Sequence, residues 1–146
     1  MECSYVHTNV VARDWRRLAR FYEAVFGCSP VPPARDLSGE WLARGTGVPG
    51  AHLRGVHLRL PGSTATLEIF EYSDAPDRPP PPAHERGWGH IAFAVSDVEE
   101  ALALVLEHGG ARLGELVERE VPGAGTVCFV YARDPEGNVI ELQRWA

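Results

Sequence analysis

Two histidines and two glutamates stand in this sequence where they could bind a metal ion together. They are His7, Glu68, His90 and Glu141, and each lies in a run with the apolar alternation of a β-strand. A lone carboxylate in such a run is costly to bury, and a divalent cation would compensate its charge. Imidazole and carboxylate ligands suit zinc, nickel, cobalt, manganese or iron(II), and leave positions open for water or substrate. Taken singly, each residue could instead be a hydrogen-bonded histidine or an exposed edge-strand glutamate.

These four residues occupy matching places in an internal repeat. HTNVVARD begins at His7 and HIAFAVSD begins at His90, and each segment has a histidine, a short apolar run and a final aspartate. Later in each half a glutamate lies between aliphatic residues, LEI around Glu68 and IEL around Glu141. The interval from histidine to glutamate is about ten residues longer in the first half. We therefore expect an insertion, most readily in the Gly-rich, loop-like stretch 38–55.

Each half must supply a sheet and a helix to position these side chains. Asp14 and Asp97 are N-cap residues ahead of two predicted helices, and glycines follow both helices as stop signals. Strands are predicted near residues 4–12, 28–32, 54–61 and 64–72 in the first half and 89–96, 112–120, 125–133 and 137–144 in the second. The prediction is an α+β protein with two tandem βαβββ modules, 4–73 and 88–146, joined by a Pro-rich linker, 74–87, within one domain of residues 1–146.

Composition and charge exclude several classes of function. The chain has 146 residues, of which 45% are hydrophobic and 23% charged, as in globular proteins. Its net charge is −6 and it has no basic run, so nothing supports a nucleic-acid partner. No apolar run reaches the length of a membrane span and the N-terminus lacks signal-peptide features, so a cytoplasmic protein is expected. Cys3, Cys28 and Cys128 are too widely spaced to indicate a disulfide framework.

Four segments carry a family resemblance: HTNVVARDWRRLARFYEAVFG, TLEIFEY, GWGHIAFAVSDVEEAL and DPEGNVIELQ. Together they resemble the vicinal oxygen chelate superfamily, which includes glyoxalase I, methylmalonyl-CoA epimerase, extradiol dioxygenases and the fosfomycin and bleomycin resistance proteins. The resemblance implies two βαβββ modules that form a cup-shaped mixed sheet around a metal, usually in a homodimer that acts on a small molecule. Carried over to this chain, the metal ligands are His7, Glu68, His90 and Glu141.

The glutamate at position 68 makes the ligand pattern most similar to glyoxalase I and the epimerase. This similarity implies a lyase or isomerase in which a metal polarises a carbonyl and the carboxylates of Glu68 and Glu141 transfer protons through an enolate. Two alternatives remain open. An iron(II) extradiol dioxygenase would use His7, His90 and Glu141 as a two-histidine, one-carboxylate set. A drug-sequestering resistance protein would use the same fold without catalysis.

Other residues have weaker claims to the site. The segment GEWLARGTGVPGAHLRG is not expected in the short epimerases, and no stretch is assigned to glutathione or coenzyme A recognition. His52 and Arg54 could reach an anionic substrate or lie solvated in a loop, as could the nearby Arg44. Trp41 and Trp88 could wall a pocket or pack in the core, and His57, which alternates with apolar neighbours in VHLRL, is expected to be structural.

Overall fold

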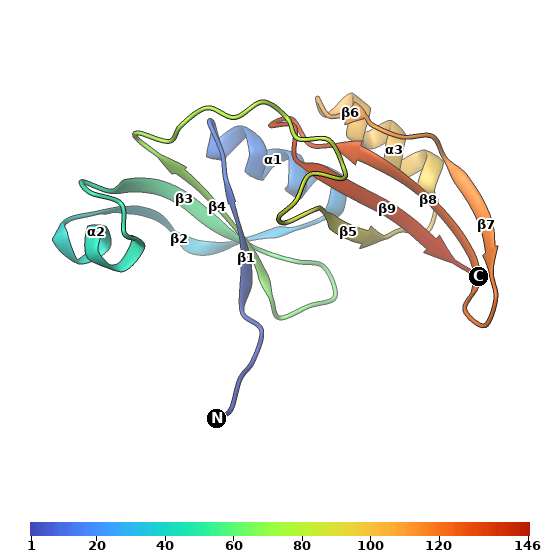
Figure 1. The fold of residues 1–146 in the computed structure, drawn as a ribbon, viewed down its shortest axis with the longest axis horizontal. Helices are drawn as coiled ribbons and strands as arrows, with labels where there is room; N and C mark the ends of the chain where they lie inside the picture. Colours follow the sequence, from blue (N-terminus) through green and yellow to red (C-terminus); the bar gives the residue numbers. More distant parts are fainter. The chain divides into compact units, whose positions relative to one another are not determined.

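A computed structural model describes residues 1 to 146, and the chain divides into two compact units. We call Met1–Asp77 module one and Arg78–Ala146 module two. Each module has its own mixed sheet and its own long helix (Figure 1). No helix in either module is both long enough and apolar enough to cross a membrane.

Module one contains a four-stranded sheet with the order β1-β4-β3-β2. Strand β4 pairs in parallel with β1 and antiparallel with β3, which pairs antiparallel with β2. Glu68 on β4 therefore has a neighbour on each side, Asn9 on β1 and His57 on β3. The elements of this module are β1 (His7–Val11), α1 (Trp15–Phe26), β2 (Ser29–Ser38), α2 (Glu40–Thr46), β3 (His52–Arg59) and β4 (Thr66–Tyr72).

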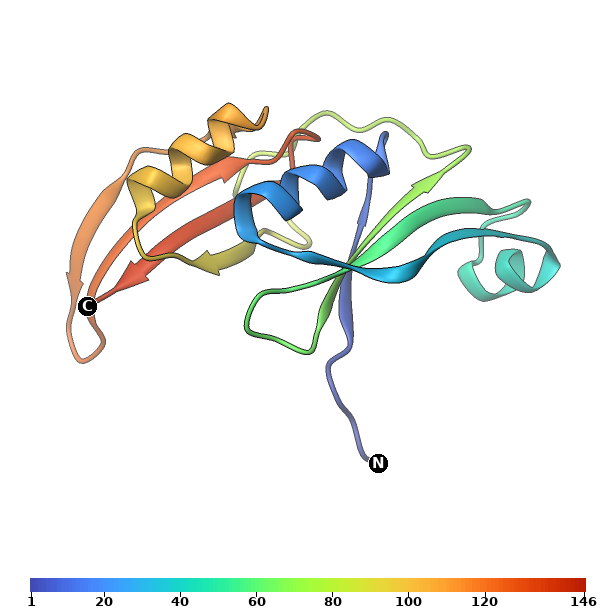
Figure 2. The ribbon, with the colours of Figure 1, turned by 180° about the vertical axis from the view of Figure 1, so that it is seen from behind.

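Helix α1 forms where the sequence predicts it and lies along one face of this sheet, against β3 and β4 (Figure 2). The Asp14 side chain caps its first turn by accepting a hydrogen bond from the backbone N–H of Arg17 at 3.0 Å. Gly27 ends it with a φ of 67°, a left-handed conformation that strains residues with a Cβ. Leu18 and Tyr22 on its inner face are fully buried.

The two faces of the module-one sheet differ in chemistry. Leu58, Leu67 and Ile69 have no exposed surface and form the core together with α1. Because successive side chains of a strand point to opposite faces, their neighbours His57 and Glu68 lie on the face away from α1. The hydrophobic face thus anchors the sheet, and the other face carries polar side chains for a site.

Helix α2 is a departure from the sequence-based expectation. The insertion around 38–55 was expected to be a loop, but β2 continues to Ser38 and a short helix follows it. Leu42 of α2 is buried with Leu53 and Phe70 in a small hydrophobic cluster. The loop prediction was wrong because this helix depends on packing against the sheet, which its Gly-rich sequence does not reveal.

Module two has the sheet order β5-β9-β8-β6, and β7 also pairs with β8. The single strand predicted at 112–120 is in fact two short strands, β6 and β7, and His90 immediately precedes β5 instead of beginning it. The Asp97 side chain caps α3 by accepting a hydrogen bond from the backbone N–H of Glu100 at 2.9 Å. The elements are β5 (Ile91–Ala94), α3 (Val98–Glu107), β6 (Ala111–Arg112), β7 (Val117–Val121), β8 (Gly125–Arg133) and β9 (Val139–Trp145).

The repeat seen in the sequence extends to the strand register. Strands β5, β9 and β8 are paired with one another as β1, β4 and β3 are in module one. Glu141 occupies the place in module two that Glu68 has in module one. The residues that flank these two glutamates across the sheet differ between the modules. Glu68 lies between Asn9 and His57, whereas Glu141 lies between Ala92 and Tyr131.

Candidate metal centre

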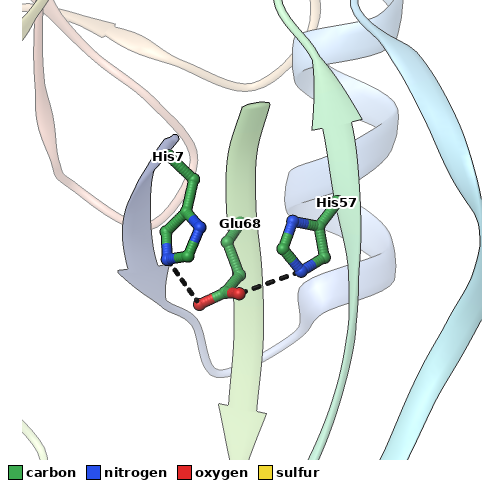
Figure 3. A group of neighbouring side chains, drawn as sticks. All are labelled: His7, His57 and Glu68. Carbon is green, nitrogen blue, oxygen red and sulfur yellow. Dashed lines mark ion pairs between the residues drawn. The ribbon is translucent and has the colours of Figure 1, made fainter. Parts of the chain in front are cut away.

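Three side chains that could ligate a metal ion meet on the polar face of module one (Figure 3). His7 begins β1, Glu68 is central in β4 and His57 lies on β3 directly across from Glu68. The Nε2 atom of His57 is 2.9 Å from Oε2 of Glu68, and Nε2 of His7 is 3.7 Å from Oε1 of the same carboxylate. Each residue offers one ligand atom, and these atoms all lie within 4.8 Å of one another. This spacing suits a small divalent cation.

Two neutral donors hold the Glu68 carboxylate in place. Asn9 donates a hydrogen bond from Nδ2 to Oε1 at 2.8 Å, and His57 lies at hydrogen-bonding distance from Oε2. The other ring nitrogen of His57, Nδ1, is 3.1 Å from Oγ1 of Thr66, a residue that is almost fully buried. Glu68 is itself only 13% exposed, so these donors provide much of what water would supply to the carboxylate.

The environment of His57 favours its neutral form. Burial lowers the pKa of His57 below its ordinary value of 6.5, and this effect outweighs the opposing influence of the Glu68 charge. Arg35 and His7 lower the same pKa further by charge repulsion. A neutral imidazole retains a lone pair, which is the state that a metal ligand or a hydrogen-bond acceptor requires.

Module two contains the histidine–glutamate pair that is equivalent to His7 and Glu68. The Nε2 atom of His90 lies 2.9 Å from Oε2 of Glu141, and the side chain of Glu141 is 16% exposed. The ring of Tyr131 packs 4.8 Å from the ring of His90, measured between centroids. Burial and the charge of Glu141 raise the pKa of the Tyr131 hydroxyl, so that it stays protonated and can donate a hydrogen bond.

The structure thus brings the four sequence-predicted ligands together two by two. His7 lies beside Glu68 in module one, and His90 lies beside Glu141 in module two. Their donor atoms are imidazole nitrogens and carboxylate oxygens on exposed or half-buried faces, which is the chemistry that a divalent transition metal needs. That the four bind one ion remains a prediction.

His57 is the residue that sequence reasoning missed. It was expected to be structural, yet it lies 2.9 Å from the Glu68 carboxylate, closer than the predicted ligand His7 at 3.7 Å. Alternation along VHLRL places it on the polar face of β3, and the antiparallel pairing of β3 with β4 then puts it opposite Glu68. A search for a third ligand could have found it by pairing these two predicted strands.

The remaining candidates have other partners or are exposed. Arg54 donates to Oε1 of Glu71 at 2.8 Å, and His52 lies 2.7 Å from Oδ1 of Asp36, so both have carboxylate partners of their own. Trp41 and Trp88 are not core residues, because 62% of Trp41 and 100% of Trp88 are exposed.

A family model decides what kind of protein carries this arrangement. The model of the Glyoxalase/Bleomycin resistance protein/Dioxygenase superfamily matches residues 4–142, which include both modules. The chain belongs to this superfamily. Its members bind divalent metals, and the His and Glu side chains of module one offer a site of that chemistry. No curated protein sequence matches the chain.

Solved structures of the same superfamily share the fold. A glyoxalase family protein from Bacillus cereus is 21% identical, with 99% of this chain and 94% of that chain covered at a TM-score of 0.75. One from Enterococcus faecalis is 23% identical, covers 97% and 96% of the two chains, and has a TM-score of 0.62. A variant of the fosfomycin resistance protein FosX from Listeria monocytogenes, complexed with Mn(II) and a dihydroxypropylphosphonic acid, is 17% identical, covers 97% and 92%, and has a TM-score of 0.55. These likenesses confirm the predicted α+β glyoxalase fold.

Proposed function

We propose that this superfamily member is a metal-dependent lyase or isomerase of the glyoxalase I or epimerase type. The observation that carries the proposal is the repeated pairing of a histidine with a glutamate at equivalent positions of the two modules, His7 with Glu68 and His90 with Glu141. A repeated pair of this kind is more than core packing requires, because buried carboxylates are costly and would otherwise be replaced by apolar residues.

The ligands in this proposal are His7 and Glu68 from module one and His90 and Glu141 from module two. Zinc, nickel, cobalt, manganese and iron(II) all suit two imidazoles and two carboxylates. The Mn(II) complex of FosX, a protein of the same fold, supports a divalent transition metal. When bound, the metal would polarise a carbonyl group of the substrate and stabilise the negative charge that develops on its oxygen.

The two glutamates would move the proton. One carboxylate takes a proton from the carbon adjacent to the substrate carbonyl, which leaves an enolate, and a carboxylic acid returns a proton to the neighbouring carbon. Glu68 and Glu141 are the candidates for these roles, and no proton is gained or lost overall. The wider proposal is a cytoplasmic homodimer that acts on a small carbonyl compound, with neither nucleic acid nor membrane as a partner.

Exchange with heavy water tests this reaction without knowledge of the physiological substrate. The protein is loaded with nickel, cobalt, zinc or manganese and incubated in D2O with hemithioacetals and branched acyl thioesters, while NMR follows the proton next to the carbonyl. We expect exchange in the wild type and a loss on the order of 10²–10⁴-fold in Glu141→Gln. Glu118→Gln, on an exposed strand, is the matched control and should exchange normally. Absence of exchange with every metal and both substrate classes would contradict the proposal.

The composition of the module-one group favours a second candidate. His7, His57 and Glu68 form a two-histidine, one-carboxylate set, which is typical of non-haem iron(II) oxygenases. An extradiol-type dioxygenase loaded with iron(II) would consume oxygen with catechols, and His57→Ala would abolish that uptake. A protein that binds a small drug tightly but shows neither proton exchange nor oxygen uptake would instead be a sequestering resistance protein.

A further inference from the structure

We propose that His57, held by Thr66, is a positioning residue that fixes the carboxylate of Glu68 from the side opposite His7. Glu68 presents one oxygen to each histidine: Oε1 lies 3.7 Å from His7 and Oε2 lies 2.9 Å from His57. At 3.7 Å, Oε1 faces His7, the other module-one ligand of the proposed centre, without a direct hydrogen bond to it. His57 therefore binds the carboxylate through the oxygen that is turned away from His7.

The hydrogen-bond chemistry defines the state of the His57 ring. A carboxylate only accepts hydrogen bonds, so the Nε2 atom of His57, 2.9 Å from Glu68, must carry the proton. In the neutral ring Nδ1 is then an acceptor, and the hydroxyl of Thr66, 3.1 Å away, donates to it. Thr66 is 9% exposed, so water competes little for that hydroxyl. The chain Thr66–His57–Glu68 is thus oriented in one direction, as in the outer-shell networks that orient metal ligands.

Module two does not have this chain, although its strands pair in the same way. Around Glu141, module two has apolar or aromatic side chains where module one has the polar neighbours of Glu68. Asn9 is replaced by Ala92, and His57 by Tyr131. Thr66, two residues before its glutamate, corresponds to Val139.

The two otherwise equivalent glutamates consequently differ in freedom. Glu68 has two side-chain donors besides His7, whereas the 2.9 Å contact with His90 is what holds Glu141. The repeat alone would make the two carboxylates alike, so the difference comes from the three substituted positions. Glu68 is thereby suited to be a fixed ligand in the metal site on which this inference rests.

A metal-free measurement tests the hydrogen-bond chain by itself. Long-range ¹H–¹⁵N NMR at pH 8 reports which imidazole nitrogen carries the proton, and the His57→Gln variant identifies the signal of His57. We expect a single tautomer with the proton on Nε2 and a shifted Nδ1 signal in Thr66→Val. A proton on Nδ1, or a mixture of tautomers, would overturn the inference whether or not the protein binds a metal.

Titration of the full chain with zinc, followed by calorimetry, tests the consequence for binding. We expect His57→Ala to raise the dissociation constant about 10–100-fold, as loss of an outer-shell partner does. His57→Gln should recover most of the affinity, because its amide can still donate to Glu68 but ligates zinc poorly. His52→Ala removes an exposed histidine–carboxylate pair from the same strand and should bind as the wild type.

The outcomes separate this inference from the proposed function. Wild-type affinity in His57→Ala would overturn it, and so would a loss in His57→Gln as large as that in His57→Ala, because His57 would then be a ligand itself. If the wild type binds no zinc, the proposed metal site fails, and the NMR result alone decides whether His57 positions Glu68.

Discussion

Replacing Gly55 by alanine should damage both the stability of module one and the geometry of the group formed by His7, His57 and Glu68. Gly55 lies on β3, two residues before His57 and on the same face of the sheet. A Cβ built on it would lie 2.0 Å from the backbone oxygen of Ile69 and 2.6 Å from Cδ1 of Phe70. Both distances are far shorter than any real Cβ contact, so β3 and β4 would have to move apart.

The size of the effect follows from what would have to move. The backbone oxygen of Ile69 belongs to the paired strand β4, so a change of side-chain rotamer alone cannot relieve the overlap with the new Cβ. Overpacking a well-filled site costs about 1–3 kcal/mol, and rigid surroundings place this substitution near or above the upper end, about 3 kcal/mol. Phe70 packs edge-on against His57 with ring centroids 5.9 Å apart, so its displacement should also weaken the contact between His57 and Glu68.

Urea unfolding followed by circular dichroism measures this change, with Gly45→Ala as the matched control. Gly45 lies in α2, and a Cβ there meets no atom within 4 Å. The same substitution should therefore stabilise the protein by about 0.5–1 kcal/mol, because alanine favours a helix. Equal stability of Gly55→Ala and the wild type, within about 0.5 kcal/mol, would refute the close approach of the two strands.

Three further predictions concern the thiols, a helix cap and pH. Only Cys3 should react with a thiol reagent in the folded protein, since Cys28 and Cys128 are buried. Burial also raises the pKa of Cys28 to about 11, which keeps its thiol protonated. Rapid labelling of a second thiol would contradict this prediction. Asp97→Ala should cost about 1 kcal/mol in the free energy of unfolding through loss of the cap on α3, and Asp97→Asn should retain most of it. Folding lowers the pKa of His57, so as the pH falls the imidazole of the unfolded chain is protonated before that of the folded chain. The free energy of unfolding should therefore fall as the pH drops below about 6.5, and it should fall less in His57→Gln than in the wild type. An equal dependence on pH in the two proteins would refute the lowered pKa of His57.

Much of the fold follows from local patterns in the sequence. The caps at Asp14 and Asp97 and the turn at Gly27 are local signals, and both long helices lie where these signals place them. The repeat adds long-range information, because two halves with the same pattern must place His90 and Glu141 as they place His7 and Glu68. That is why the proximity of histidine and glutamate within each module follows from the sequence.

What could not be predicted depends on contacts between segments distant in sequence. The burial of Leu42 against Leu53 and Phe70 stabilises α2, and no local signal in the Gly-rich stretch predicts this packing. The role of His57 requires the register of β3 against β4, which the connection between the strands and their packing determine together. Alternation showed which face His57 occupies but not which residue it meets there.

Elemental analysis of the purified full chain tests the central claim, a divalent metal held by the paired histidines and glutamates. We expect about one transition-metal ion per chain in the wild type and its loss in Glu68→Gln and His90→Ala, because each variant removes a proposed ligand. Glu118→Gln, which alters an exposed glutamate of module two, should retain the metal. A wild-type protein that contains no metal and takes none up after incubation with zinc, nickel, cobalt, manganese or iron(II) would show that these residues do not form a metal site.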